Sequence, residues 1–178
     1  DIVTQNIDGL HQAAGSGSVV ELHGSAWKVK RATNTRDFVS KEGVVWEDRT
    51  QPLVPALRDV RPEPDAEEAD IALADLPHVT EEDGSRSLLR PAVVWFGEGL
   101  DPTVIEAEVP YLLSSCDMLL SIGTSSVVYP AAGFMSTVAA RPGTTVAEFN
   151  LADTPASDAC DFIFRGKSGE LLPQLVER

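Results

Sequence analysis

Two short stretches near the N-terminus place polar side chains directly after apolar runs. Residues 4–9 read TQNIDG, and a second apolar run ends with His23 followed by Gly24. Histidine has an unperturbed pKa of about 6.5, so it can act as a general base near neutral pH. Asn and Asp before Gly also form ordinary turns and helix N-caps, and a lone His is more often structural than catalytic. Both the chemical and the structural interpretation of these stretches are therefore open.

Two further stretches could bind an anion and a sugar. Gly123 is followed by three hydroxyl residues at an expected strand-to-helix junction, where backbone N–H groups and short donors can bind a phosphate. This pattern is weak when it is taken alone. Residues 148–150, Glu-Phe-Asn, end another apolar run and place an acidic or amide group where a doubly wound fold holds a ribose.

Expected strands and helices alternate along most of the chain and predict an α/β fold. Residues 93–96 and 118–122 are apolar at consecutive positions, which is typical of strands covered on both faces in a parallel sheet. Such sheets carry their functional loops at the carboxyl ends of the strands, where the four polar stretches lie. The expected strands are residues 1–7, 18–24, 90–97, 117–123 and 144–150, and the expected helices are residues 9–15, 102–114, 131–141 and 169–177.

Composition excludes several classes of partner. The 178 residues are 43% hydrophobic, and 14 Lys plus Arg against 28 Asp plus Glu give a formal net charge of −14. This charge disfavours nucleic acid and anionic membrane surfaces as partners. No run approaches the roughly 18 apolar residues that cross a bilayer, so we expect a soluble protein. Two cysteines, Cys116 and Cys160, are too few for a disulfide framework or a four-cysteine metal site, which indicates a reducing compartment.

Five motifs follow one another along the chain. They are TQNIDGLH at residues 4–11, ELHGS at 21–25, LRPAVVWFGE at 89–98, GTSSVVYPAAG at 123–133 and EFN at 148–150. In this order they resemble the sirtuin family of NAD-dependent protein lysine deacylases, over residues 1–27 and 88–178. GTSSVVYPAA and VAEFN look closest to the bacterial and mitochondrial type that includes the desuccinylases.

The resemblance implies two domains. Residues 1–27 and 88–178 would form a doubly wound, Rossmann-like NAD-binding domain, and residues 28–87 a small inserted domain that is acidic and partly disordered. Residues 62–83 contain nine carboxylates, three prolines and no Lys or Arg. Such a composition buries too little apolar surface to offset the entropy lost on ordering, so we expect this part to be mobile.

The resemblance also implies a role for each motif. His23 would be the general base in a reaction that consumes NAD, releases nicotinamide and yields free lysine and O-acyl-ADP-ribose. Asn6 and Asp8 would line the nicotinamide pocket. The implied cofactor-binding residues are Gln5, Asn6, Ile7, Asp8, Gly123, Thr124, Ser125, Asn150, Leu151 and Ser168. The implied substrate-binding residues are Val94, Trp95, Phe96, Gly97, Glu98 and Tyr129.

Residues 94–98 have two interpretations. A strand edge that ends in Gly97 can pair with an extended peptide, while Trp95 and Phe96 line a tunnel for the lysine side chain. Alternatively, these residues belong to a buried strand whose aromatic side chains lie in the core. The Glu98 that follows the glycine favours the first interpretation.

The sequence departs from the family pattern in two ways. The cysteine pairs that hold a structural zinc ion in most sirtuins are absent: residues 30–34 read KRATN, and His78 is the only soft ligand shortly before Leu89. One imidazole does not make a tetrahedral site, so we expect no zinc. The family's first strand and glycine-rich phosphate loop are also absent, so we expect residues 1–178 alone to be nearly inactive.

Three functional hypotheses follow. The first is an NAD-dependent lysine deacylase, of deacetylase or desuccinylase type, that acts on acylated peptides or proteins in the cytoplasm or in mitochondria. The second is a non-catalytic sirtuin-like remnant that serves as a peptide-binding module. Asn6, Asp8 and His23 favour the first, because a binding module needs none of them. The third, a different Rossmann-like NAD-binding protein, is disfavoured by HGS and VWFGE.

Overall fold

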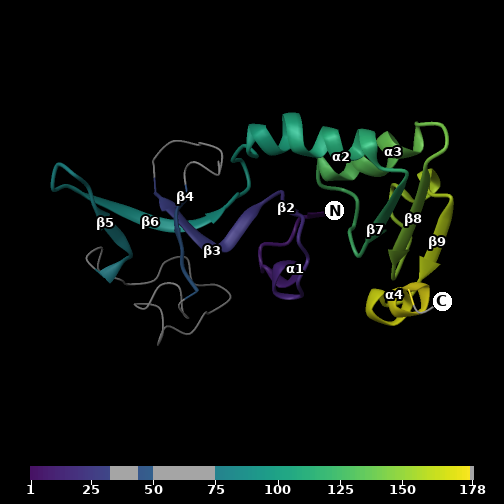
Figure 1. Ribbon diagram of the computed structural model, residues 1–178, viewed down its shortest axis with the longest axis horizontal. Coiled ribbons are helices and arrows are strands. Elements are labelled where there is room, and N and C mark those ends of the chain that lie inside the picture. Colours follow the sequence, from purple (N-terminus) through teal and green to yellow (C-terminus); the bar gives the residue numbers. More distant parts are fainter. Residues whose placement is uncertain (33–43, 50–74, 177–178) are drawn as a thin grey trace. The chain divides into compact units, whose positions relative to one another are not determined.

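The computed structural model describes residues 1–32, 44–49 and 75–176 of the chain (Figure 1). The chain divides into two compact units, Asp1–Glu108 and Val109–Arg178. Each unit contains parallel strands together with helices, which confirms the α/β fold class. Within the described ranges, no helix is both long enough and apolar enough to span a membrane.

The first unit begins with a parallel pair of strands. Strand β1 (Ile2–Thr4) pairs with β2 (Val19–Glu21), and the short helix α1 (Leu10–Ala13) connects them. The turn before α1 uses the Asp-Gly pair as the sequence allows: the Asp8 carboxylate accepts a hydrogen bond from the Leu10 N–H, and Gly9 has a φ of 71°. The polar stretch after β1 is therefore the junction that leads into a helix.

The first unit also contains an antiparallel sheet with strand order β4-β3-β6-β5. Its strands are β3 (Gly24–Arg31), β4 (Val44–Glu47), β5 (His78–Thr80) and β6 (Arg86–Val93). Gly24 begins β3 with a φ of 74°, and a Cβ atom there would lie 2.0 Å from the Ala92 carbonyl oxygen. Only glycine therefore permits the close approach of β3 to β6 next to His23.

The acidic stretch differs from the sequence expectation at its C-terminal end. Residues 62–74, which hold most of its carboxylates, lie outside the described residues. Residues 78–80 form β5, which pairs with β6, and Glu81 accepts two hydrogen bonds from Arg31. Composition alone did not predict this strand because its partner is supplied by a segment later in the sequence. The proposed division at residues 28–87 stays a prediction.

The second unit contains a three-stranded parallel sheet of order β7-β8-β9. Its strands are β7 (Met118–Ile122), β8 (Thr145–Asn150) and β9 (Phe162–Arg165). The helical elements are the π-helix η4 (Val104–Glu108), which closes the first unit, and α2 (Val109–Ser115), η5 (Ala131–Gly133), α3 (Phe134–Ala139), η6 (Ser157–Ala159) and α4 (Ser168–Val176) in the second. Strand β9 was not expected from the sequence.

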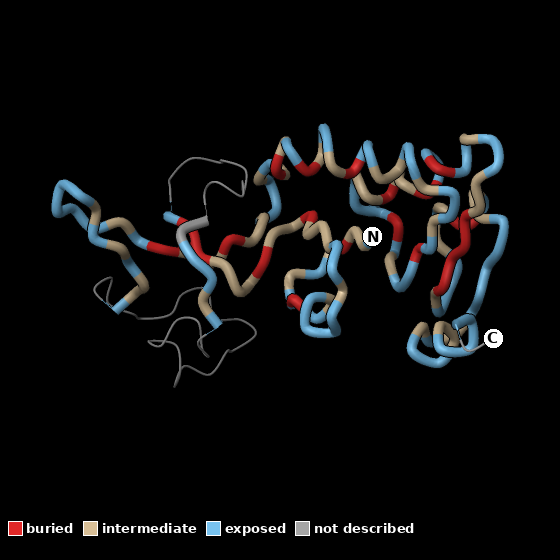
Figure 2. The backbone as a smooth tube through the Cα atoms, viewed as in Figure 1, coloured by how far each residue is buried: buried red, intermediate tan, exposed pale blue. Residues whose placement is uncertain are grey.

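Strand β8 is the centre of the second unit, and Figure 2 shows it as a mostly buried segment. Val146 packs with Met135 and Val138 of α3 in a fully buried cluster. Phe149 stacks on Phe164 of β9, with ring centroids 4.6 Å apart. Alternate residues of the run at 118–122 are exposed on β7 in this chain, so the expectation that both faces of this run are covered stays a prediction.

Candidate active site

His23 lies between β2 and β3 with its ring fixed by the backbone. Its Nδ1 atom is 3.0 Å from the backbone carbonyl oxygen of Gln5. A carbonyl oxygen can only accept a hydrogen bond, so Nδ1 is the donor in this contact and Nε2 is the ring nitrogen left to accept a proton from a substrate. The side chain is half-buried. This contact assigns the role of base to Nε2.

The polar loop that follows β1 is held by hydrogen bonds to its backbone oxygens. The Leu22 N–H donates to Thr4 over 2.9 Å, and the Ala26 N–H donates to Ile7 over 3.0 Å. The indole Nε1 of Trp27 donates to the Asp8 carbonyl oxygen. Residues 4–8 and His23 therefore lie together, as expected at the carboxyl ends of two parallel strands.

Trp27 is a site residue that the sequence analysis missed. Its indole packs against Gly9, where an added Cβ would lie 3.0 Å from the ring, and its N–H holds the Asp8 carbonyl. The only signal in the sequence was an aromatic residue with a donor shortly after the His-Gly pair, which needs a partner when it packs. Trp27 supports the loop that carries Asn6 and Asp8, whose own side chains are exposed.

Residues 94–98 form a turn rather than a strand, which corrects the sequence expectation. Strand β6 ends at Val93, and the Glu98 N–H donates to the Trp95 carbonyl oxygen over 2.9 Å. The Glu98 carboxylate accepts the Trp95 N–H at 3.0 Å and so removes that donor from a strand ladder. Gly97 has a φ of 88°, which bends the chain away from the sheet.

The alternative interpretation of residues 94–98, with aromatic side chains in the core, is wrong, whereas their role in substrate binding stays a prediction. Trp95 is 55% exposed and Phe96 is fully exposed. The Val94 N–H donates to the His23 carbonyl oxygen over 2.9 Å. Both aromatic side chains are therefore presented to solvent by a turn that is attached to the backbone of the base.

A buried ion pair supports this turn. Arg90 on β6, which the sequence analysis did not single out, forms an ion pair with Glu98. Burial by itself raises the pKa of the Glu98 carboxyl, but hydrogen bonds from Arg90 and the Trp95 N–H, together with the positive charges of Arg90 and Lys30, hold that pKa below its usual range. Glu98 is therefore ionised at neutral pH.

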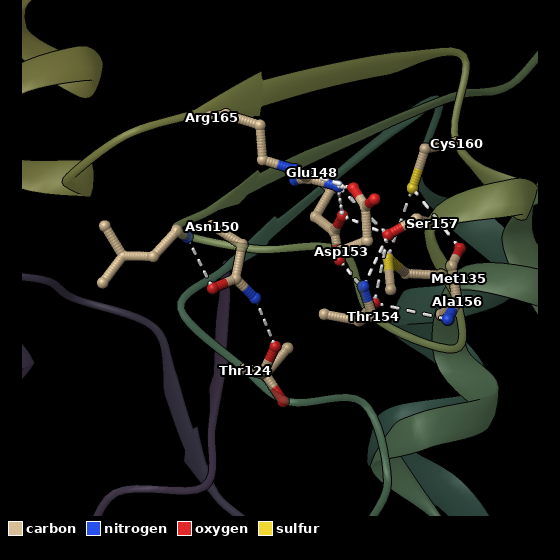
Figure 3. A network of polar contacts seen from close by, with 11 residues as sticks. Thr124, Met135, Glu148, Asn150, Asp153, Thr154, Ala156, Ser157, Cys160 and Arg165 are labelled. Carbon is tan, nitrogen blue, oxygen red and sulfur yellow. Dashed lines mark hydrogen bonds and ion pairs between the residues drawn. The ribbon is translucent and has the colours of Figure 1, made fainter.

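In the second unit, the loops after β7 and β8 are tied to each other (Figure 3). The Asn150 side chain donates to the Thr124 carbonyl oxygen over 2.6 Å and accepts the Leu151 N–H at 2.8 Å. The Gly123 N–H donates to the Phe149 carbonyl oxygen. The stretches at 123–126 and 148–151 thus lie side by side, as the sequence analysis predicted for parallel strands.

Ser168 and Tyr129 complete the predicted set in the second unit. The Gly166 N–H donates to the Asn150 carbonyl oxygen, and α4 begins two residues later at Ser168. Ser168 is therefore close in sequence to a residue that contacts the Asn150 loop. Tyr129 is 78% exposed. Its role as a substrate-binding residue stays a prediction.

The carboxylate of Glu148 is not available to bind a ribose. Of the acidic and amide groups considered for ribose binding at residues 148–150, the acidic one is therefore wrong. Its side chain is fully buried and accepts hydrogen bonds of 2.6 Å from both Thr154 and Ser157, while Arg165 forms an ion pair with it at 2.9 Å (Figure 3). Burial raises the pKa of Glu148, but these hydrogen bonds and the Arg165 charge lower it below its usual range. Glu148 anchors the loop that follows Asn150.

Comparisons with known proteins identify the family. The Sir2 family model matches residues 1–130. The chain belongs to the Sir2 family. It is 47% identical over 176 residues to the NAD-dependent protein deacylase sirtuin-5, mitochondrial, of Canis lupus familiaris, covering 98% of this chain and 53% of that protein. It is also 38% identical to NAD-dependent protein deacylase 2 of Pyrobaculum aerophilum, covering 99% of this chain and 57% of that protein.

Solved structures agree with this assignment. A Sir2 homolog in complex with NAD is 34% identical and superposes with a TM-score of 0.73, covering 98% of this chain and 56% of that one. A Sir2–p53 peptide–NAD+ complex is 28% identical with a TM-score of 0.70, covering 98% and 61%. The resemblance found in the sequence is confirmed. The chain spans about half the length of the curated sirtuin-5 relatives that it matches.

The part of this chain that the structure describes has no counterpart of the zinc site considered in the sequence analysis. No group of three or more His, Cys, Asp or Glu side chains could bind an ion there. The ring of His78 instead contacts Arg86. The prediction that the protein holds no zinc stays a prediction, since residues 33–43 lie outside the described part.

Proposed function

We propose that the protein is an NAD-dependent protein lysine deacylase that transfers the acyl group to ADP-ribose and releases nicotinamide. The observation that carries this proposal is the contact of 3.0 Å between Nδ1 of His23 and the Gln5 carbonyl oxygen, which occupies Nδ1 and leaves Nε2 as the available proton acceptor. A peptide-binding module would need no such base. Relatives named NAD-dependent protein deacylase support the same conclusion.

His23 performs the acid–base step of this mechanism. Bound NAD supplies an electrophilic ribose carbon with nicotinamide as its leaving group, and it is consumed in each turnover. The acyl oxygen of the lysine substrate would displace nicotinamide from this carbon. Nε2 of His23 would then accept the proton of a ribose hydroxyl so that the hydroxyl oxygen attacks the acyl carbon, and water would complete the transfer with release of free lysine. The Gln5 carbonyl oxygen holds the ring in place and stabilises the positive charge that the ring acquires.

The two ends of NAD would be held by different loops. Gln5, Asn6, Ile7 and Asp8 would hold the nicotinamide side, because their loop is attached to the segment that carries His23. Gly123, Thr124, Ser125, Asn150, Leu151 and Ser168 would hold the phosphate and adenosine side. In support, hydrogen bonds join the two loops of this second group. Loops after parallel strands commonly bind nucleotides.

An acylated lysine peptide would bind at residues 94–98, with Tyr129 as an additional contact. The exposed rings of Trp95 and Phe96 can line the path of the lysine side chain. The net charge of −14 disfavours nucleic acid as an alternative partner. Mitochondrial relatives favour a mitochondrial location over a cytoplasmic one.

The test uses the full-length protein with acetyl- and succinyl-lysine peptides. Nicotinamide release and O-acyl-ADP-ribose are measured with and without NAD, for the unsubstituted protein and for His23→Ala. We expect His23→Ala to lower kcat/KM by about 10² or more, the effect of a lost general base, with little change in melting temperature. His78→Ala, on the exposed strand β5, is the matched control and should retain activity. Retained turnover in His23→Ala would refute the assignment of His23 as the general base.

A further inference from the structure

The base of the turn at residues 94–98 is built from one largely buried ion pair. The side chains of Arg90 and Glu98 are only 12% and 11% exposed. Arg90 also donates to the Val93 carbonyl oxygen over 3.0 Å, and Glu98 accepts the Trp95 N–H at 3.0 Å. The pair therefore joins the last residues of β6 to both ends of the turn.

The same guanidinium fixes the orientation of an exposed ring. Its carbon atom lies 4.1 Å from the centroid of the Trp95 ring, which is the geometry of a cation–π contact. Trp95 and Phe96 remain exposed above this support. The ion pair below the turn is thus largely buried, while the aromatic side chains of the turn face outwards.

This arrangement does not follow from a need for stability. A buried ion pair loses much of its Coulomb energy to desolvation, and well-packed apolar side chains often stabilise a fold equally well. What a guanidinium–carboxylate pair adds is a fixed geometry, because its planar donors match the carboxylate oxygens. Here that geometry is imposed on a turn with two exposed aromatic side chains.

The position of the turn also determines its distance from the base. The Val94 N–H donates to the carbonyl oxygen of His23 over 2.9 Å. Next to it, Gly24 contacts the Ala92 carbonyl so closely that a Cβ atom has no space. A group bound by the turn is therefore placed relative to His23 through short main-chain contacts.

We propose that Arg90 and Glu98 are positioning residues for the acyl-lysine substrate: they hold residues 94–97 so that a bound peptide directs its acyl group to His23. This inference rests on the proposed deacylase function. It concerns substrate placement, because the ion pair, the hydrogen bonds and the ring contact of these two side chains lie within residues 90–98.

The test separates the peptide from NAD in steady-state kinetics of the full-length protein. Glu98→Gln keeps an acceptor for the Trp95 N–H but removes the charge that holds Arg90. We expect the KM for an acetyl-lysine peptide to rise about tenfold, the size of one lost charge-assisted hydrogen bond, while the KM for NAD stays within about twofold. Arg90→Lys, which keeps the charge and loses the planar donors, should give an intermediate rise.

Glu81→Gln is the matched control. Glu81 pairs with Arg31 in the same antiparallel sheet, but this pair is more exposed and makes no contact with the turn. Equal rises in both KM values for Glu98→Gln, or a peptide KM like that of Glu81→Gln, would overturn the positioning role.

A binding experiment distinguishes failure of this inference from failure of the proposed function. Absence of turnover in the unsubstituted protein would refute the deacylase proposal. Fluorescence anisotropy with a labelled acetyl-lysine peptide then still measures the contribution of the ion pair. If Glu98→Gln binds the peptide about tenfold more weakly than the unsubstituted protein, the positioning role is supported. If the two proteins bind it equally, or if neither binds it, the positioning role is contradicted.

Discussion

The buried carboxylate of Glu148 allows a quantitative prediction. Glu148→Gln keeps the shape of the side chain but replaces one acceptor oxygen with an NH2 donor. The hydroxyl of Thr154 can rotate to accept from this donor, whereas the guanidinium of Arg165 can only donate. We therefore expect the amide to turn its NH2 towards Thr154, so that its oxygen still faces Arg165 at the contact of 2.9 Å but no longer carries the negative charge.

The magnitude follows from that contact. Arg165 retains Asp153 as a partner, so the guanidinium is not left unpaired. Removing the negative charge weakens this hydrogen bond without breaking it, so the free energy of unfolding should fall by about 1–2 kcal/mol. At about 2–4 °C for each kcal/mol in a protein of this size or somewhat larger, the melting temperature should fall by roughly 2–8 °C.

The pH dependence provides an internal check. Because the pKa of Glu148 in the folded protein is below its ordinary value of 4.5, its carboxylate contributes full stability above that value. The contribution is lost as the pH falls through the lower folded pKa. The stability difference between the unsubstituted protein and Glu148→Gln should therefore be constant above about pH 6 and decrease below pH 4.5.

Thermal unfolding by circular dichroism, repeated from pH 8 to pH 4, measures this difference. Glu170→Gln is the control, because its ion pair with Lys167 is exposed at both ends and should contribute close to nothing. The reasoning would be refuted if Glu148→Gln had the same melting temperature as the unsubstituted protein. It would also be refuted if the stability difference between the two proteins grew towards acid pH.

Two further predictions concern the glycine beside the base and the metal. Gly24→Ala should lower the free energy of unfolding by about 3 kcal/mol or more in denaturant titrations, since the new Cβ meets the Ala92 carbonyl oxygen at 2.0 Å. Gly84→Ala shares a positive φ of 81° but has open space around the Cβ, so it should cost only about 1–2 kcal/mol, and equal losses would contradict the contact argument. Elemental analysis of the full-length protein should find well below one zinc ion per chain, and chelators should not unfold it; near-stoichiometric zinc would show that ligands were overlooked.

The sequence predicted the loops of the site because their positions follow from local patterns. His23, the loop at residues 4–8 and the stretch at 123–126 each come after a short apolar run, and parallel strands bring such positions to one edge. Within each unit, the structure brings the predicted site loops together.

The missed features depend on contacts between distant residues. Trp27 donates a hydrogen bond to the carbonyl oxygen of Asp8, 19 positions earlier. Arg90 forms an ion pair with Glu98, at the end of a turn that was expected to be a strand. Glu148 carries the residue type expected for ribose binding, but a loop at 154–157 and β9 cover it. Periodicity and composition contain no information on such pairings.

The loop at residues 4–8 is held through its main chain, and this has a consequence for how the site can change during evolution. Four of its five carbonyl oxygens, those of Thr4, Gln5, Ile7 and Asp8, accept hydrogen bonds from residues 22–27. Every amino acid supplies such an oxygen. Substitutions in the loop can therefore alter which ligand is recognised without dismantling the scaffold, and selection for a new ligand can proceed separately from selection for folding.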